Sequence, residues 1–127
     1  MRIAAIIVRT LMGLLFIFAS VMFFISPAPT DLQGNMKTYF DGLAASGYFF
    51  TLLKVTELIC GIALVAGRFV PLALIILSPI IVNILFVHIF LERSGLPVAI
   101  ILVLANSFLG YYYWNNFKQL FIAKAAV

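Results

Sequence analysis

The sequence is poor in charge, cysteine and histidine. Only 9% of its 127 residues are charged, and only four of them are acidic. Soluble domains typically have about 25% charged residues, so this shortage excludes an ordinary water-soluble globular protein. Because Cys60 is the one cysteine, an intramolecular disulfide and a CxxC redox pair are both excluded. Because His88 is the one histidine, the sequence predicts no metal site.

The basic balance does not indicate a nucleic-acid partner. The net charge is +4 and the pI is near 9.5, but the basic residues are scattered singly along the chain. Binding to nucleic acid requires a clustered basic patch or stripe, which is missing here. The serine hydroxyls have no visible base partner, so the sequence assigns no catalytic residue and leaves open whether the protein is an enzyme.

Hydrophobic residues are abundant instead, at 65% of the chain, and they fall into four long blocks. A bilayer core is roughly 30 Å thick, and a spanning helix needs about 20 largely apolar residues. The sequence therefore predicts an all-α membrane protein, a single transmembrane domain over 1–127 built as a four-transmembrane-helix bundle. The predicted helices cover about 3–25, 48–66, 70–91 and 96–117. The first block is longer than a signal-peptide core, so we interpret it as a retained helix.

The one long connection, about 30–46, predicts a short amphipathic helix between the first two spans. Leu32, Met36, Tyr39, Phe40 and Leu43 recur in it at helical spacing. This pattern is typical of a helix that lies in the membrane interface.

Basic residues predict the orientation of the bundle. One side carries more of them, namely Arg2, Arg68, Lys118 and Lys124, against Lys37 and Arg93 on the other. The positive-inside rule then places the N- and C-termini in the cytoplasm and the 30–46 segment outside.

Five polar side chains interrupt the apolar blocks and form the predicted ligand-binding cluster: Arg9, Lys54, Glu57, Asn83 and Asn106. Ionisable groups in the middle of a membrane are costly and by default indicate a functional site. At about 1.5 Å per residue, Glu57 and Asn106 both fall near the bilayer midplane, and Lys54 and Asn83 fall outward of it.

Structural explanations for these polar residues remain open. Lys54 and Glu57 are spaced i,i+3 and can form a purely structural ion pair. Asn83 and Asn106 can act as interhelical hydrogen bonds. Arg9 can reach inward to Glu57 or extend to the headgroups.

Other residues are predicted to support the cluster from nearby positions. Tyr39 and Phe40 are candidates for a lid over the site from outside. The small residues Gly13 and Gly61 allow close approach of the first two spans.

The run Lys54-Val-Thr-Glu57-Leu-Ile-Cys-Gly61, with Arg9-Thr-Leu-Met-Gly13 before it and Pro79-Ile-Ile-Val-Asn83 after it, resembles the DoxX-like family of small bacterial membrane proteins. The resemblance covers nearly the whole chain. It implies a four-helix protein of the bacterial inner membrane. Members have been linked to a thiosulfate:quinone oxidoreductase subunit and to membrane complexes that handle oxidative or thiol stress.

Two functions of different classes follow as hypotheses. The first is a site for a small hydrophobic or lipid-like ligand, a quinone being the most natural, in the membrane subunit of an oxidoreductase or stress-response complex. No cofactor motif is evident. The second is a non-enzymatic scaffold or assembly factor that binds a partner membrane or periplasmic protein, or a second copy of itself. A small transporter is a weaker third hypothesis, because no inverted repeat is visible.

Overall fold

The computed structural model describes residues 1–25, 34–91 and 93–123, and every regular element in these ranges is helical. In chain order the elements are α1 (Arg2–Ile25), α2 (Gly34–Ala44), α3 (Phe49–Ala66), α4 (Val70–Phe90), α5 (Leu96–Tyr112), α6 (Trp114–Phe117) and the 3-10 turn η1 (Lys118–Phe121). The predicted all-α membrane bundle is confirmed.

Three helices, α1, α3 and α4, are each long and apolar enough to cross a membrane. A fourth span exists when α5 is counted together with the bent segment that follows it. At about 1.5 Å per residue, the 18 residues of α3 extend roughly 27 Å, close to the thickness of the hydrocarbon core.

The fourth span differs from its predicted range of about 96–117. The straight helix ends at Tyr112, and the segment Trp114–Phe121 turns away from it by 78°. The polar residues Asn115 and Asn116 and the aromatic residues before them occur at this point. Amphipathic aromatic rings favour the headgroup level of a membrane, so a segment that turns here can follow the interface.

The outer surface of the bundle is apolar, as lipid contact requires. Phe18 is 66% exposed, Ile59 61% and Leu104 63%. A soluble monomer rarely exposes so continuous an apolar surface. Inside the bundle, Leu64 and Leu77 are fully buried. The apolar residues therefore pack a small core and cover the lipid-facing surface at once.

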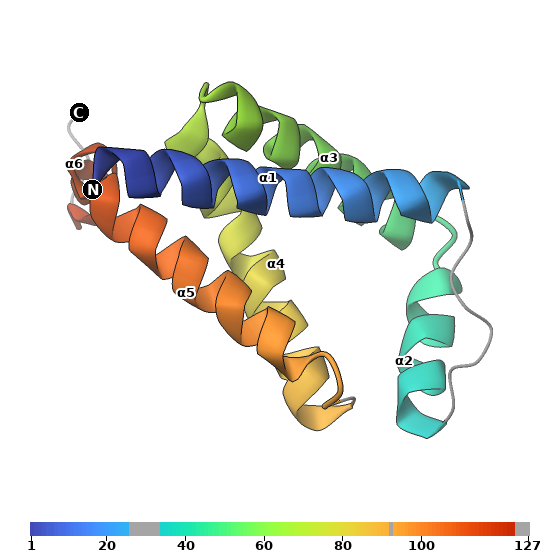
Figure 1. Cartoon of the computed structure of the whole chain (residues 1–127). Coiled ribbons are helices and arrows are strands. Elements are labelled where there is room, and N and C mark those ends of the chain that lie inside the picture. The colour runs from blue at the N-terminus through green and yellow to red at the C-terminus, as the bar shows by residue number, and fades with distance from the viewer. Residues whose placement is uncertain (26–33, 92, 124–127) are drawn as a thin grey trace.

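The closest packing in the bundle is between α1 and α3, which lie side by side (Figure 1). A Cβ added to Gly13 would lie 2.7 Å from the carbonyl oxygen of Gly61, and one added to Gly61 would lie 2.8 Å from the carbonyl oxygen of Gly13. Each glycine thus makes room for the backbone of the other helix, which is the role expected of small residues in membrane helices.

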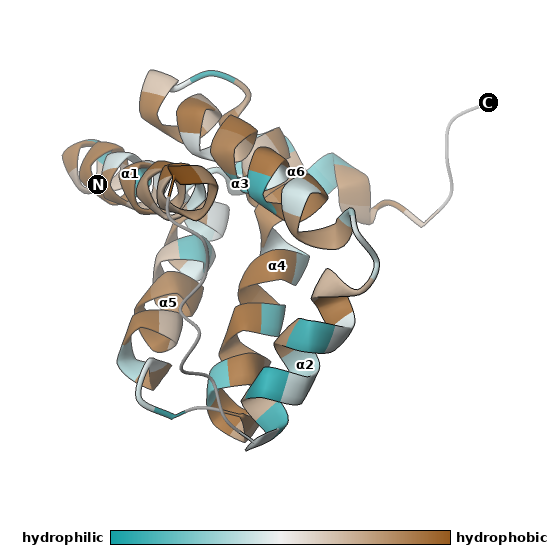
Figure 2. Ribbon diagram, turned by 90° about the vertical axis from the view of Figure 1, so that its right-hand side faces the viewer, coloured by the Kyte–Doolittle hydropathy of each residue, from teal (hydrophilic) through white to brown (hydrophobic). Residues whose placement is uncertain are grey.

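The two ends of the bundle differ in character. The start of α1, the turn between α3 and α4, and α6 lie towards one end, whereas α2 stands at the other (Figure 1). Hydrophilic residues are concentrated on α2, while α1, α4 and α5 are mainly hydrophobic (Figure 2). The predicted segment of about 30–46 is helical over Gly34–Ala44; its first residues, 30–33, lie outside the described ranges. Gly47 follows α2 with a φ of 80°, a left-handed conformation that glycine adopts without strain.

Candidate functional site

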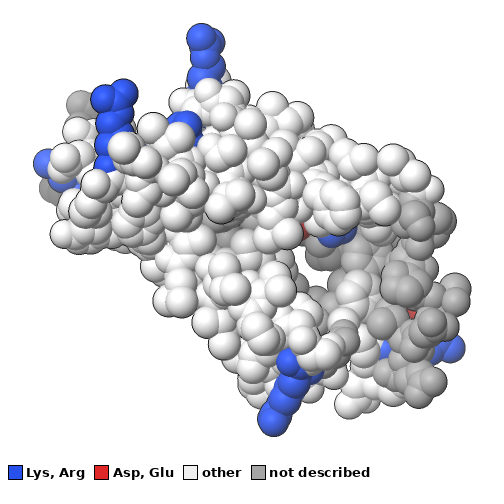
Figure 3. Space-filling model, viewed as in Figure 1, with Lys and Arg blue, Asp and Glu red and all other residues white. Residues whose placement is uncertain are grey.

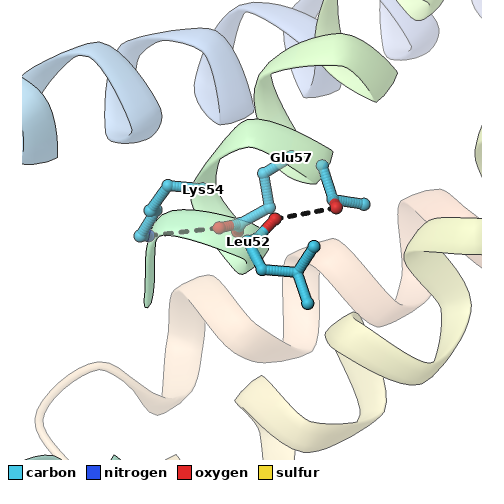
Figure 4. A network of polar contacts seen from close by, with 4 residues as sticks. Leu52, Lys54 and Glu57 are labelled. Atoms are coloured by element: carbon cyan, nitrogen blue, oxygen red, sulfur yellow. Dashed lines mark hydrogen bonds and ion pairs between the residues drawn. The ribbon is translucent and has the colours of Figure 1, made fainter. Parts of the chain in front are cut away.

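The centre of the candidate site is an ion pair on α3, halfway along the helix. Lys54 Nζ lies 3.2 Å from Glu57 Oε2, and the two side chains are 21% and 4% exposed. Figure 4 shows them joined along one side of the helix. Apart from this contact with the Lys54 ammonium, the buried Oε2 has no hydrogen-bond donor among the described residues. A buried carboxylate oxygen without a directed donor retains its capacity to accept one.

This pair lines a cavity of about 1200 Å³ whose wall is formed by α1, α2, α3 and α4. Lys54 and Glu57 are both in the wall, and Asn83 of α4 is in it as well. The space-filling view shows a hollow with a basic and an acidic patch at its edge (Figure 3). Three of the five predicted site residues therefore share one cavity.

Aromatic rings from three helices form a continuous row along this cavity. Phe23 of α1 lies with its ring centroid 5.9 Å from Lys54 Nζ and also 5.9 Å from the ring of Phe50. Phe50 in turn stacks on Phe40 of α2, with centroids 5.5 Å apart and ring planes 10° from parallel. A cation near a ring face and stacked ring pairs are both favourable arrangements. The row leads from the ion pair to α2.

Helix α2 is held over the cavity by contacts to two other helices. The Asn83 side-chain amide donates a hydrogen bond of 3.1 Å to the Tyr39 hydroxyl, which links α4 to α2. Phe40 provides the second link through its stack on Phe50 of α3. The two predicted lid residues thus lie in the cavity wall, side by side on α2.

Arg9 lies away from the cavity. Its guanidinium packs against Gly67, since a Cβ added there would be 2.6 Å from Arg9 Nη1. Gly67 ends α3 with a φ of 76°, at the helix terminus whose free carbonyls favour a cation. Gly67 is ten residues beyond Glu57, or about 15 Å along the axis. Of the two interpretations that the sequence left open, the structure shows Arg9 extended towards the bundle end and not paired with Glu57.

Asn106 also lies apart, in a second and smaller cavity lined by parts of α4, α5, α6 and η1. Its amide donates a hydrogen bond of 3.1 Å to Ser78 Oγ, and Ser78 Oγ donates one of 2.7 Å to the carbonyl of Leu74. This chain joins α5 to α4, as the interhelical-bond interpretation expects. The single five-residue cluster is therefore divided: depth along the membrane placed Asn106 near Glu57, but α5 packs on a different side of α4.

Three ionisable residues in the wall of the first cavity were not included in the predicted site. Lys37 and Asp41 of α2 and His88 of α4 all line the first cavity. The His88 ring also lies against Gly95, in the turn between α4 and α5. A signal for its place in the cavity wall was present, because Ile80, Ile84 and His88 recur every four residues on the lining side of α4.

Within the described ranges, no group of three or more histidine, cysteine, aspartate or glutamate side chains is placed to hold a metal ion. The chemistry that the first cavity offers is that of organic ligands: an ammonium group, a carboxylate, an amide, a phenol and stacked rings. Comparison with protein-family models, with curated proteins and with solved structures gave no match for this chain.

Proposed function

We propose that this protein binds a quinone-like ligand, a polar ring with an apolar tail, in the cavity formed by α1, α2, α3 and α4. The observation that carries the proposal is the buried Lys54–Glu57 pair in the wall of a cavity of about 1200 Å³. Small-molecule sites are typically apolar cavities with a few convergent polar groups, and this cavity has that composition.

The polar groups match the two ends of a quinone head. Lys54 offers an ammonium donor to a ring carbonyl. Tyr39 accepts its hydrogen bond from Asn83, so the phenol's own proton can be donated to the ligand. Glu57 supplies an acceptor for the hydroxyl of the reduced form. Phe23, Phe40 and Phe50 provide ring faces for the head and apolar walls for the tail.

The cellular setting belongs to the same proposal. The DoxX-like resemblance favours a multi-pass protein of the bacterial inner membrane, acting as the membrane subunit of an oxidoreductase or stress-response complex. A partner membrane or periplasmic protein would supply the electrons. Arg2, Arg68 and Lys118 belong to the bundle end that also carries α6, which favours a cytoplasmic N-terminus and C-terminus and an outward-facing α2.

Native mass spectrometry of the protein in mild detergent tests ligand binding directly. The wild type is expected to carry a bound mass, or to acquire one when a short-tailed quinone is added. Glu57→Gln keeps the shape of the side chain but removes its charge, and it should lower occupancy by about tenfold, the effect of losing one charge-assisted hydrogen bond.

The matched control is Thr56→Val, one residue away on the same helix. The Thr56 hydroxyl donates to the Leu52 carbonyl of its own helix, and the residue is not in the cavity wall. Occupancy should be unchanged in this variant. If the wild type binds no quinone at any concentration, the proposal is wrong and the scaffold function is favoured. If Glu57→Gln binds as the wild type does, the Lys54–Glu57 pair is structural only.

A further inference from the structure

The second cavity is a distinct space at the other end of the bundle. It has a volume of about 530 Å³ and shares no lining residue with the first. The bent segment Trp114–Phe121 forms one side of it, and α4 and α5 form the rest. Its wall is mainly apolar and aromatic, including Leu74, Ile75, Phe117 and Phe121.

Two polar side chains in this wall bond to one another, whereas the buried carbonyl oxygen Oδ1 of Asn106 has no hydrogen-bond partner among the described residues. The Asn106 amide donates to Ser78 Oγ, and the Ser78 hydroxyl proton is donated to the Leu74 carbonyl. The hydroxyl can therefore only accept from Asn106, which fixes the direction of both bonds. Because most of the lining residues are apolar or aromatic, the interior of the cavity suits an aliphatic chain.

Gly110 of α5 adds an independent observation. It lies in the cavity wall, and a Cβ added to it would meet no described atom within 4 Å. Glycine is unfavourable inside a helix unless its small size is used. At Gly13 and Gly61 that size admits another backbone, whereas at Gly110 it enlarges the cavity.

Positive charge flanks the cavity on two elements. Lys118 is exposed and lies between the lining residues Phe117 and Leu120. Arg68 is exposed in the turn that leads into α4, six residues before the lining residue Leu74. The segment Trp114–Phe121 is bent by 78° from the axis of α5, the orientation expected of a helix that lies along a membrane surface when α5 crosses it.

We infer that this cavity binds one acyl chain of an anionic phospholipid, whose phosphate is held at the surface by Lys118 and Arg68. An apolar cavity with an exposed cationic side chain on each of two elements that line it or lead into it has the complementarity that an anionic lipid requires. A zwitterionic lipid would gain the chain contacts but not the net charge. This inference does not depend on the proposed function of the first cavity.

Trp114 provides the measurement, because it is the one tryptophan of the chain and it lines this cavity. The protein is placed in nanodiscs of unbrominated phosphatidylcholine that contain increasing fractions of a lipid with a brominated acyl chain, which quenches tryptophan fluorescence on contact. Brominated phosphatidylglycerol should quench at a lower mole fraction than brominated phosphatidylcholine. The half-saturating fraction is the mole fraction of brominated lipid at which quenching is half complete. Each basic residue that contributes should make this fraction about fivefold lower for phosphatidylglycerol than for phosphatidylcholine.

Two variants separate the headgroup from the chain. Lys118→Gln should raise the half-saturating fraction of phosphatidylglycerol about fivefold and leave phosphatidylcholine unchanged. Lys37→Gln, at the α2 end, should have no effect on either lipid. Gly110→Leu fills the cavity without altering charge, and it should reduce quenching by both brominated lipids.

Two results would overturn the inference. Equal quenching of the wild type by the two lipids would exclude recognition of the anionic headgroup. Full quenching of a folded Gly110→Leu protein would exclude insertion of the chain into the cavity. Gly110→Ala serves as a smaller step, and the helical circular dichroism of each variant verifies its fold.

Discussion

Replacing Gly13 by alanine should loosen the contact between α1 and α3 by an amount that the structure allows us to estimate. The new Cβ would lie 2.7 Å from the Gly61 carbonyl oxygen, 2.8 Å from Val65 Cγ2 and 3.0 Å from Leu64 Cβ, where ordinary contacts begin at 3.4 Å. The nearest of these atoms is backbone and cannot rotate away, so the helices must separate by several tenths of an ångström.

Overpacking of this kind costs about 1–3 kcal/mol. Alanine returns about 0.5–1 kcal/mol, because it is the better residue inside a helix. The net expectation for Gly13→Ala is a loss of about 0.5–2 kcal/mol, which changes the ratio of open to closed protein by a factor of about 2–30.

Cys60 is a suitable probe of that ratio. It is the one cysteine of the chain, is 3% exposed, and precedes Gly61 at the contact. The rate at which a maleimide labels it in mild detergent, with increasing sodium dodecyl sulfate, reports how often the contact between α1 and α3 opens. Gly13→Ala should raise this rate by the factor given above.

Gly110→Ala is the matched control, since it has the same change of side chain inside a helix but no described atom within 4 Å of the new Cβ. Its labelling rate should equal that of the wild type or be slightly lower. Equal rates for Gly13→Ala and the wild type would refute the close backbone contact between α1 and α3.

Three further predictions concern the ion pair, α2 and the turn after α3. Lys54→Met leaves the Glu57 charge without its partner and should lower the free energy of unfolding by about 2–4 kcal/mol, somewhat less than for a fully enclosed pair because Lys54 is 21% exposed. Adding Glu57→Leu should recover most of this loss. A double variant less stable than Lys54→Met would contradict the reasoning. Tyr39→Phe and Asn83→Leu should each accelerate amide hydrogen exchange in α2 about two- to tenfold. Because both variants remove the same hydrogen bond, the double variant should exchange no faster than either single variant. Additive effects would show that the two side chains act separately. Gly67→Ala should lower the midpoint temperature of thermal unfolding, because a φ of 76° costs a non-glycine residue about 1–2 kcal/mol and the new Cβ meets the Arg9 guanidinium. An unchanged midpoint would mean that the backbone of this turn adapts to alanine.

The helices were largely predictable from the sequence. The predicted range of about 3–25 agrees with α1 at Arg2–Ile25, and 48–66 and 70–91 agree with α3 and α4 to within a residue at either end. Hydrophobic length is a strong signal because lipid leaves few alternatives to a spanning helix. The bend after Tyr112 was not predicted, because the aromatic residues that follow it fit equally well into a straight helix or into one lying at the interface.

The sequence predicted how far along its helix each candidate site residue lies, but not towards which neighbouring helix its side chain points. Residue counting placed Glu57 near the middle of its helix, and the structure agrees. It also placed Asn106 at a similar depth, but the side of α5 that packs on α4 carries Asn106 to Ser78 and a separate cavity. The direction in which a side chain points around its helix depends on which helices are neighbours. An apolar sequence with little amphipathic pattern does not clearly encode which side of a helix faces which neighbour.

The contacts that hold α2 also have a consequence for the timing of ligand exchange. A ligand that passes beneath α2 must wait until the Tyr39–Asn83 hydrogen bond and the Phe40–Phe50 stack are both broken. Together these contacts contribute about 1–3 kcal/mol, so α2 would be released in roughly one molecule in five to one in two hundred at any moment. Arrival and departure by this route are slowed by the same factor, which leaves the equilibrium affinity unchanged but lengthens the residence time of each bound molecule. On the proposed function, weakening the hold on α2 should therefore shorten residence more than the loss of the Tyr39 and Phe40 ligand contacts alone would do.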